Sequence, residues 1–225
     1  MPKQVEVAAS ITTADFGNLY RVIRKLERAG IDRLHLDVMD GVFVPNITFG
    51  PDIVAAVRRL TRLTIDVHLM IAYPDRFVDR FIAAGADTLT FHIEVAASAD
   101  SKRTTIEQIR AAGRIPGLAV SPATPMTAVG EFVDDLGIIM IMTVEPGFGG
   151  QHFMAEPAPK IAEARRMFGD RAGTEVHVDG GVNAETAGIV GGYGVDVCVV
   201  GSALFQRGRD TADEVRAVRQ AARRD

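Results

Sequence analysis

Eight short runs of aliphatic and β-branched residues recur along this chain, and helical patterns of apolar residues lie between most of them. This alternation most constrains the fold, because strands that alternate with helices favour a parallel sheet covered by those helices. The runs are VEVAASI (5–11), RLHLDVM (33–39), TIDVHLM (64–70), DTLTFHI (87–93), PGLAVS (116–121), GIIMIMTV (137–144), TEVHVDG (174–180) and VDVCVVG (195–201). We interpret each run as one buried strand.

The segments between the runs have the spacing of amphipathic helices. In residues 15–29, apolar side chains from Leu19 to Leu26 recur at intervals of three and four residues, and Gly30 follows as a stop signal. The joint from helix to strand repeats as AGIDRL, AGADTL, AAGRIP and YGVDVC. We expect these glycines to end their helices in a conformation with positive φ.

Eight strand–helix units without a Pro-, Gly- or Ser-rich linker predict one domain over residues 1–225, folded as a (β/α)8 TIM barrel. An open doubly wound sheet is the alternative, although that fold seldom needs eight units. In a barrel of this kind, the chemistry collects at the carboxyl ends of the strands. Polar residues at those ends are therefore the candidates for function.

Composition excludes several classes of protein. The net charge of −4 argues against a nucleic-acid-binding surface, and no apolar run approaches the ~20 residues of a membrane span. The start of the chain, MPKQVEVAAS, lacks the long apolar core of a signal peptide. The lone Cys198 excludes an internal disulfide framework and fits the reducing cytoplasm, and we interpret it as a core residue.

Two histidines and two aspartates fall at the ends of three predicted strands. His35 and Asp37 stand two positions apart in one strand and share a face, because side chains alternate along a strand. His68 and Asp179 occupy the ends of two other strands. Such a pair could be a hydrogen-bonded structural unit, but four groups at one barrel mouth favour a nitrogen and oxygen site for a divalent transition metal ion.

Other polar strand residues have structural interpretations. His92 and His177 are predicted to be satisfied structural histidines, and His152 a loop residue. Asp66 shares the parity of His68, so it is either an acceptor that orients that imidazole or a structural residue inside the barrel.

Three methionines, Met39, Met70 and Met142, also fall near the predicted mouth. Methionine usually fills core space, and an apolar collar around the reacting carbons is the second interpretation.

Glycine-rich loops follow the last three strands. VEPGFGGQHF (144–153), DGG (179–181) and GSALF (201–205) each allow backbone N–H groups to approach an anion. In barrels, the loops after strands seven and eight often hold a phosphate group. A tight turn would explain any one of these segments, and the three together predict a phosphorylated substrate.

The chain resembles the ribulose-phosphate 3-epimerase family along nearly its whole length. The resemblance rests on ASITTADF, LHLDVMDGVFVPNITFGP, DVHLM, SPATP, MTVEPGFGGQ, VDGGVN and GSALF, in that order. It implies a barrel of the ribulose-phosphate-binding type and a cytoplasmic isomerase of the pentose phosphate pathway. The implied reaction interconverts D-ribulose 5-phosphate and D-xylulose 5-phosphate. We further expect a homo-oligomer, with no nucleic-acid or membrane partner.

The resemblance assigns roles to individual residues. His35, Asp37, His68 and Asp179 would bind one divalent ion (Zn, Mn, Fe or Co), and Asp37 and Asp179 would also be the acid–base pair. Proton removal on one face and return on the other would pass through an enediolate. The implied substrate contacts are Ser10, His68, Gly147, Phe148, Gly149, Gly150, Gly180, Gly181, Gly201 and Ser202.

The chain departs from the family pattern at several positions, among them Ala9, where members commonly have Pro. Thr12 stands where members commonly have Leu, Ile93 where they have Pro, and Ser121 where they have Asn. The segment MTVEPGF is similar to the allulose 6-phosphate branch, so a 3-epimerase of D-allulose 6-phosphate is the alternative. A second alternative is a lyase on a related phosphate-binding barrel. Such decarboxylases and synthases carry D-x-K-x-x-D where this chain reads DVHLMI, which argues against that function. A non-catalytic barrel that binds a sugar phosphate is the third alternative.

Overall fold

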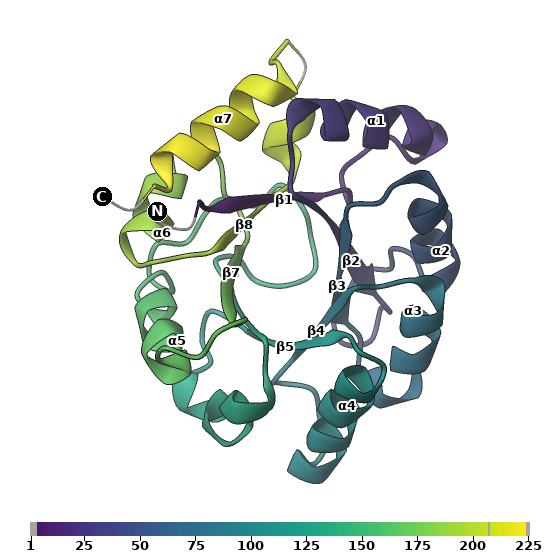
Figure 1. The fold of residues 1–225 in the computed structure, drawn as a ribbon, viewed down its shortest axis with the longest axis vertical. Helices are drawn as coiled ribbons and strands as arrows, with labels where there is room; N and C mark the ends of the chain where they lie inside the picture. Colours follow the sequence, from purple (N-terminus) through teal and green to yellow (C-terminus); the bar gives the residue numbers. More distant parts are fainter. Residues whose placement is uncertain (1–3, 207, 224–225) are drawn as a thin grey trace.

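This computed structural model describes residues 4–206 and 208–223. Within those residues, eight parallel strands form a closed barrel in which each strand pairs with its sequence neighbour and β8 returns to β1 (Figure 1). The predicted TIM-barrel architecture is confirmed, and every strand overlaps its predicted run. The strands are β1 (Glu6–Ser10), β2 (Arg33–Met39), β3 (Thr64–Met70), β4 (Thr88–His92), β5 (Ile115–Val120), β6 (Ile138–Met142), β7 (Glu175–Asp179) and β8 (Val197–Val200).

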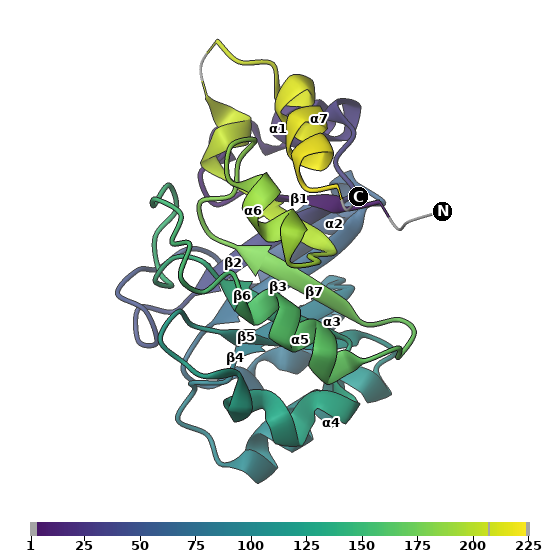
Figure 2. The same ribbon diagram turned by 90° about the vertical axis from the view of Figure 1, so that its left-hand side faces the viewer.

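Helices surround the barrel and cover the outer face of its strands (Figure 1). The loops that follow β2 and β6 extend from one end of the barrel, away from the start of β1 (Figure 2). The described α-helices are α1 (Leu19–Ala29), α2 (Pro51–Leu60), α3 (Val78–Ala84), α4 (Ala99–Ala111), α5 (Lys160–Phe168), α6 (Ala187–Gly192) and α7 (Thr211–Ala221). The described 3-10 helices are η1 (Phe16–Asn18), η2 (Pro74–Arg76), η3 (Met126–Asp135) and η4 (Ser202–Phe205).

The main hydrophobic core lies between the strands and the helices. In β2, Leu34 and Leu36 point outward and are fully buried, in the same apolar cluster as Ile23 and Leu26 of α1. This arrangement follows from strand alternation, which sends every second residue of β2 into the helical shell. Burial of these side chains fixes the register of β2, because a slip by one residue would expose the whole apolar set.

The opposite face of β2 points into the barrel and is polar. Arg33, His35 and Asp37 are all buried there. At the amino end of the barrel, Nε of Arg33 donates to Glu6 over 2.9 Å and Nη1 donates to Glu175 over 3.0 Å. Buried charges need such partners. The barrel therefore encloses a network of ionisable groups beside two small apolar clusters, which consist of Ala119, Met140, Met142 and Val144 and of Ala8, Val197 and Val199.

The expected helix stops adopt the predicted conformation. Gly30 and Gly85 follow α1 and α3 with φ angles of 81° and 99°, and their N–H groups cap carbonyls of the last helical turn. Glycine adopts this left-handed conformation without the steric penalty of a Cβ atom.

The fifth unit differs from the prediction of eight strand–helix pairs. The connection from β5 to β6 is the 3-10 helix η3, which begins directly after Pro125. Its buried residues Met126, Val129 and Phe132 recur every three positions, which matches the three residues per turn of a 3-10 helix. The apolar face of this segment therefore packs on the barrel without an α-helical period.

Among the described residues, no helix combines the length and the apolar character that crossing a membrane requires.

Candidate metal and substrate site

Four side chains meet at the carboxyl end of the barrel. His35 and Asp37 come from β2, His68 from β3 and Asp179 from β7. One ligand atom from each residue lies within 4.8 Å of the others. Parallel strands end at the same rim, which explains why residues far apart in the sequence converge there. The structure thus brings together all four residues of the expected metal-binding set.

His35 presents one ring nitrogen to the carboxylates and the other to Asp66. Its Nε2 lies 3.2 Å from Oδ1 of Asp37 and 3.9 Å from Oδ2 of Asp179. Its Nδ1 lies 2.8 Å from Oδ2 of Asp66. The interpretation of Asp66 as an acceptor for His68 is wrong, because the register of β2 and β3 pairs Asp66 with His35 and His68 with Asp37.

His68 uses the opposite nitrogen. Its Nδ1 lies 3.1 Å from Oδ1 of Asp37 and 3.5 Å from Oδ2 of Asp179. Its Nε2 lies 2.9 Å from Nε2 of His92. Both imidazoles therefore turn one nitrogen toward the two carboxylates and hold the other in a separate contact.

This donor set fits a divalent transition metal ion. Burial by itself would raise the pKa of Asp37, but His35 and His68 hold that pKa well below its usual range. Burial would lower the pKa of His35, yet Asp37 and Asp66 raise it well above its usual value. The carboxylate is therefore held in the charged form that a cation needs. The raised pKa of His35 means that a bound cation would displace the proton from Nε2, after which two imidazole nitrogens complete a nitrogen and oxygen set.

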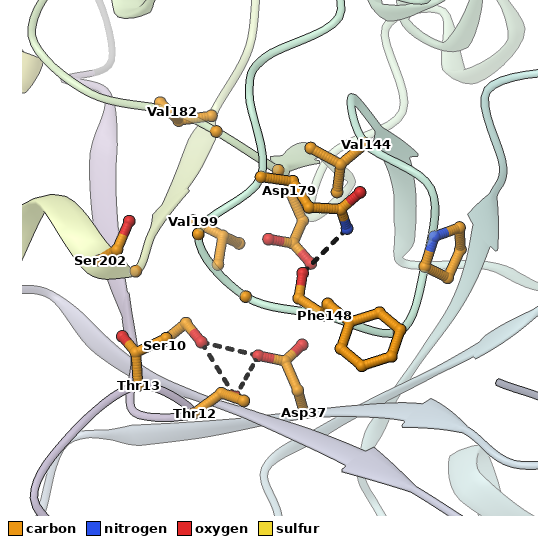
Figure 3. Close-up of a pocket in the computed structure, with 18 of the residues that line it drawn as sticks. Ser10, Thr12, Thr13, Asp37, Val144, Phe148, Asp179, Val182, Val199 and Ser202 are labelled. Atoms are coloured by element: carbon orange, nitrogen blue, oxygen red, sulfur yellow. Dashed lines mark hydrogen bonds between the residues drawn. The ribbon is translucent and has the colours of Figure 1, made fainter. Parts of the chain in front are cut away.

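Asp37 has a second set of partners on its outer oxygen. Oγ of Ser10 donates to Oδ2 of Asp37 over 2.6 Å, and Oγ1 of Thr12 donates to the same atom over 2.7 Å. Figure 3 shows both hydroxyls directed at Asp37, with Asp179 facing it across the pocket. The contact from Thr12 is absent from the sequence-based expectations. Its signal is the i, i+2 spacing from Ser10, which continues the inward face of β1 past the end of that strand.

A pocket opens above these carboxylates and contains most of the expected substrate-contacting residues. Phe148 and Ser202 lie on its wall (Figure 3), and the side chain of Phe148 remains half exposed. The predicted residues that line the pocket are Ser10, Asp37, Met39, Met70, Met142, Gly147, Phe148, Gly149, Gly150, Asp179, Gly180, Gly181, Gly201 and Ser202. His35 and His68 are fully buried beneath it. The three methionines therefore lie at the mouth, as the collar interpretation requires.

The glycines around this pocket serve two purposes. Gly180 and Gly181 have φ angles of 124° and 65°, and a Cβ on Gly181 would lie 2.5 Å from the backbone nitrogen of Phe153. Turn geometry and close packing alone account for these two positions. At Gly201, an added Cβ would meet Ser10 at an ordinary 3.7 Å. The space beside Gly201 therefore belongs to the pocket.

Comparison with known proteins identifies the family. Residues 6–205 match the model of the ribulose-phosphate 3 epimerase family. The chain belongs to this family. It is 45% identical to ribulose-phosphate 3-epimerase of Bacillus subtilis (strain 168), over 89% of this chain and 92% of that protein. It is 40% identical to ribulose-phosphate 3-epimerase of Escherichia coli (strain K12), over 96% of both chains.

Solved structures that resemble this epimerase-family chain show the same fold at much lower identity. KGPDC from Streptococcus mutans has a TM-score of 0.70 and 14% identity over 97% of both chains. The 3-hexulose-6-phosphate synthase from Salmonella typhimurium has a TM-score of 0.72 and 16% identity over 97% of this chain and 98% of that one.

Two positions where the sequence departs from the expected pattern, Ile93 and Ser121, have different surroundings. Ile93 is buried in the main hydrophobic core, where an apolar side chain is expected. Ser121 begins the loop after β5, and its N–H donates to Oε1 of Glu94 over 2.8 Å.

The structural residues His177 and Cys198 and the predicted loop residue His152 lie outside the pocket lining. His177 is buried inside the barrel with its Nε2 3.0 Å from Glu175, and His152 is exposed in a loop. Cys198 is buried, and burial raises the pKa of its thiol to about 12.

Proposed function

We propose that this member of the epimerase family interconverts D-ribulose 5-phosphate and D-xylulose 5-phosphate. The names and identities of its relatives support this substrate pair. The single observation that carries the chemistry is the placement of Asp37 and Asp179, which face one another across the pocket above two buried imidazoles (Figure 3). An enzyme that inverts one carbon needs two proton-transfer groups on opposite sides of that carbon.

The reaction balances with these two carboxylates. One of them takes the proton from C3, the electron pair of the broken C–H bond forms a C2–C3 double bond, and negative charge moves to the ketone oxygen. The other carboxylic acid then returns a proton to the opposite face of C3, which regenerates the ketone with inverted configuration. In the reverse direction the two residues exchange roles.

His35, Asp37, His68 and Asp179 would hold the divalent ion, with Zn, Mn, Fe or Co as the candidates for this mixed nitrogen and oxygen set. When bound, the ion supplies a Lewis acid that stabilises the negative charge on the ketone oxygen. Met39, Met70 and Met142 would surround the reacting carbons and limit the access of water.

The phosphate group would bind in the glycine-rich part of the pocket. No Lys or Arg is among the described residues that line it. Backbone N–H groups of the loops at Gly180 and Gly201, together with the hydroxyl of Ser202, are therefore the donors we assign to the phosphate.

We further propose that residues 1–225 work as a single domain in the cytoplasm, and that the protein forms a homo-oligomer.

Turnover of purified protein in heavy water tests the proposed reaction. Either pentulose phosphate should yield the other, with deuterium at C3 of the product. Asp37→Asn and Asp179→Asn should each lower kcat by roughly a hundredfold to ten-thousandfold. Asp52→Asn, an exposed carboxylate in the first turn of α2, is the matched control and should retain full activity. Full activity in both site variants would refute the two-carboxylate scheme. Faster turnover of D-allulose 6-phosphate than of either pentulose phosphate would show that the proposed substrate is wrong.

A further inference from the structure

His68, His92 and Glu94 form a hydrogen-bonded series of buried or partly buried groups that leads away from the four converging residues. Nε2 of His68 lies 2.9 Å from Nε2 of His92, and Nδ1 of His92 lies 3.0 Å from Oε2 of Glu94. The two imidazole planes are 25° apart and their centroids are 5.0 Å apart, which places the rings edge to edge as a hydrogen bond requires. Both rings are fully buried, and Oγ of Ser121 lies 3.4 Å from Nδ1 of His92 as a second, longer contact.

Simple rules determine which ring nitrogens of His68 and His92 carry a hydrogen. Two imidazole nitrogens 2.9 Å apart share one hydrogen, because two N–H groups would repel and two lone pairs would make no bond. A carboxylate can only accept, so Nδ1 of His92 carries the hydrogen that Glu94 receives. Nε2 of neutral His92 is then an acceptor, and Nε2 of His68 must be the donor. That arrangement fixes a hydrogen on Nε2 of His68. It leaves Nδ1, which lies 3.1 Å from Oδ1 of Asp37 and 3.5 Å from Oδ2 of Asp179, as the nitrogen that can give up its hydrogen and bind a cation.

We propose that His92 and Glu94 are positioning residues that fix His68 in the tautomer able to bind a cation through Nδ1. The inference rests on the metal site of the proposed function. Groups that orient a metal-binding histidine typically change metal affinity by 10- to 100-fold when they are removed. His35 has a simpler arrangement for the same purpose, since its Nδ1 contacts Asp66 directly at 2.8 Å.

The carboxylate of Glu94, at the far end of this hydrogen-bonded series, is held in one orientation by the loop after β5. The N–H of Ser121 donates to Oε1 of Glu94 over 2.8 Å, so that oxygen must remain an acceptor. Nζ of Lys160 bonds the carbonyls of Ser121, Pro122 and Thr124 at 3.1, 2.7 and 2.6 Å and thereby fixes the loop. A glutamine in place of Glu94 would be oriented by the same N–H group of Ser121.

This orientation makes Glu94→Gln a sharp test. The N–H of Ser121 would select the amide oxygen, and the amide NH2 group would then face Nδ1 of His92. His92 would have to carry its hydrogen on Nε2, and His68 would be forced to carry its own on Nδ1. The substitution changes one atom and reverses every hydrogen bond up to the metal-facing nitrogen.

The experiment measures metal affinity and the His68 tautomer separately from turnover. Competition of Zn²⁺ and Mn²⁺ with a chromophoric chelator should give a Kd about 10- to 100-fold weaker in Glu94→Gln and in His92→Phe. Long-range ¹H–¹⁵N spectra of the metal-free protein should show a hydrogen on Nε2 of His68 in the wild type, and a hydrogen on Nδ1 but none on Nε2 in Glu94→Gln. Glu107→Gln, an exposed carboxylate of α4, is the control and should leave both measurements unchanged.

Wild-type metal affinity together with an unchanged His68 tautomer in Glu94→Gln would overturn the inference. The same result would leave the proposed epimerase activity standing. Conversely, if Glu94→Gln switches the tautomer and weakens metal binding but the wild type does not interconvert pentulose phosphates, the proposed function would be refuted and the inference retained.

Discussion

Thr12 donates a hydrogen bond of 2.7 Å to Oδ2 of Asp37 from the segment that follows β1. The hydroxyl of Ser10 donates to the same oxygen over 2.6 Å. Hydrogen bonds to a carboxylate favour its charged form and so oppose its protonation. This chain therefore places a second hydroxyl on the residue that we propose as one of the two bases.

Thr12→Val should weaken catalysis selectively at low pH. Loss of a donor makes Asp37 easier to protonate, so the acid limb of the kcat/KM profile should move to higher pH, with roughly tenfold lower kcat/KM at the acid end. The measurement is a pH–rate profile of the wild type and the variant. Thr13→Val is the control, because Thr13 lines the same pocket without a described hydrogen bond to Asp37. A uniform loss at all pH values would contradict the assignment.

Metal removal should abolish turnover and leave the barrel folded. The hydrophobic core lies between strands and helices and does not depend on the four residues at the mouth. Dialysis against a chelator should therefore leave the far-UV circular dichroism unchanged while kcat falls to background. Activity should return with Zn, Mn, Fe or Co, and Tm should rise with metal concentration because only the folded chain presents the site. Full activity after exhaustive chelation would contradict the metal site.

Arg33→Met should destabilise the fold more than the loss of an exposed arginine. Arg33 is buried between Glu6 and Glu175, so its removal leaves carboxylates without their cation, which typically costs about 3–5 kcal/mol. Arg110 pairs with Asp135 but is 52% exposed, and Arg110→Met should cost less than ~1 kcal/mol. Urea unfolding measures both values. Adding Glu175→Gln to Arg33→Met should recover part of the loss, and equal effects of the two single variants would refute this account.

The fold and the four converging residues could be predicted because both depend on local rules. Alternation along β2 puts His35 and Asp37 on one face, and parallel strands end at one rim, so no long-range distance is needed to bring His68 and Asp179 beside them. The regular repetition of strand and helix likewise determines the barrel.

The remaining features depend on register between strands, which periodicity does not encode. The pairing of His35 with Asp66 follows from the offset of β2 against β3. The contact between His92 and His68 is another such feature, because one strand alone does not reveal that the two rings meet. The 3-10 form of η3 depends on apolar residues spaced by three, a pattern that also occurs within helical sequences.

Cys198 should be unreactive in the native protein. Burial raises the pKa of its thiol to about 12, so the nucleophilic thiolate is scarce at ordinary pH and the sulfur is also inaccessible. A disulfide reagent at pH 8 should modify no thiol in the native chain and one thiol after unfolding in urea. Cys198→Ala should retain kcat and lose roughly 1 kcal/mol of stability from the small cavity. Rapid native modification with loss of turnover would contradict the interpretation as a core residue.

Glu94 should make the free energy of unfolding depend on pH in acid. Burial by itself would raise the pKa of Glu94, but hydrogen bonds to His92 and Thr124 lower it from 4.5 to about 2. Between these values the unfolded chain binds more protons than the folded one, so the stabilisation is complete above pH 4.5 and is lost as the pH falls toward 2. One such group adds a slope of at most about 1.4 kcal/mol per pH unit.

Urea unfolding at several pH values between 2 and 5 measures this slope. Glu94→Gln should flatten it relative to the wild type, because glutamine does not titrate, whereas Glu107→Gln should not, because that carboxylate is exposed on α4. The two variants remove the same charge, so a difference between them isolates the effect of burial and hydrogen bonding. Identical slopes in Glu94→Gln and the wild type would mean that the carboxylate is not held in its charged form by His92 and the loop after β5.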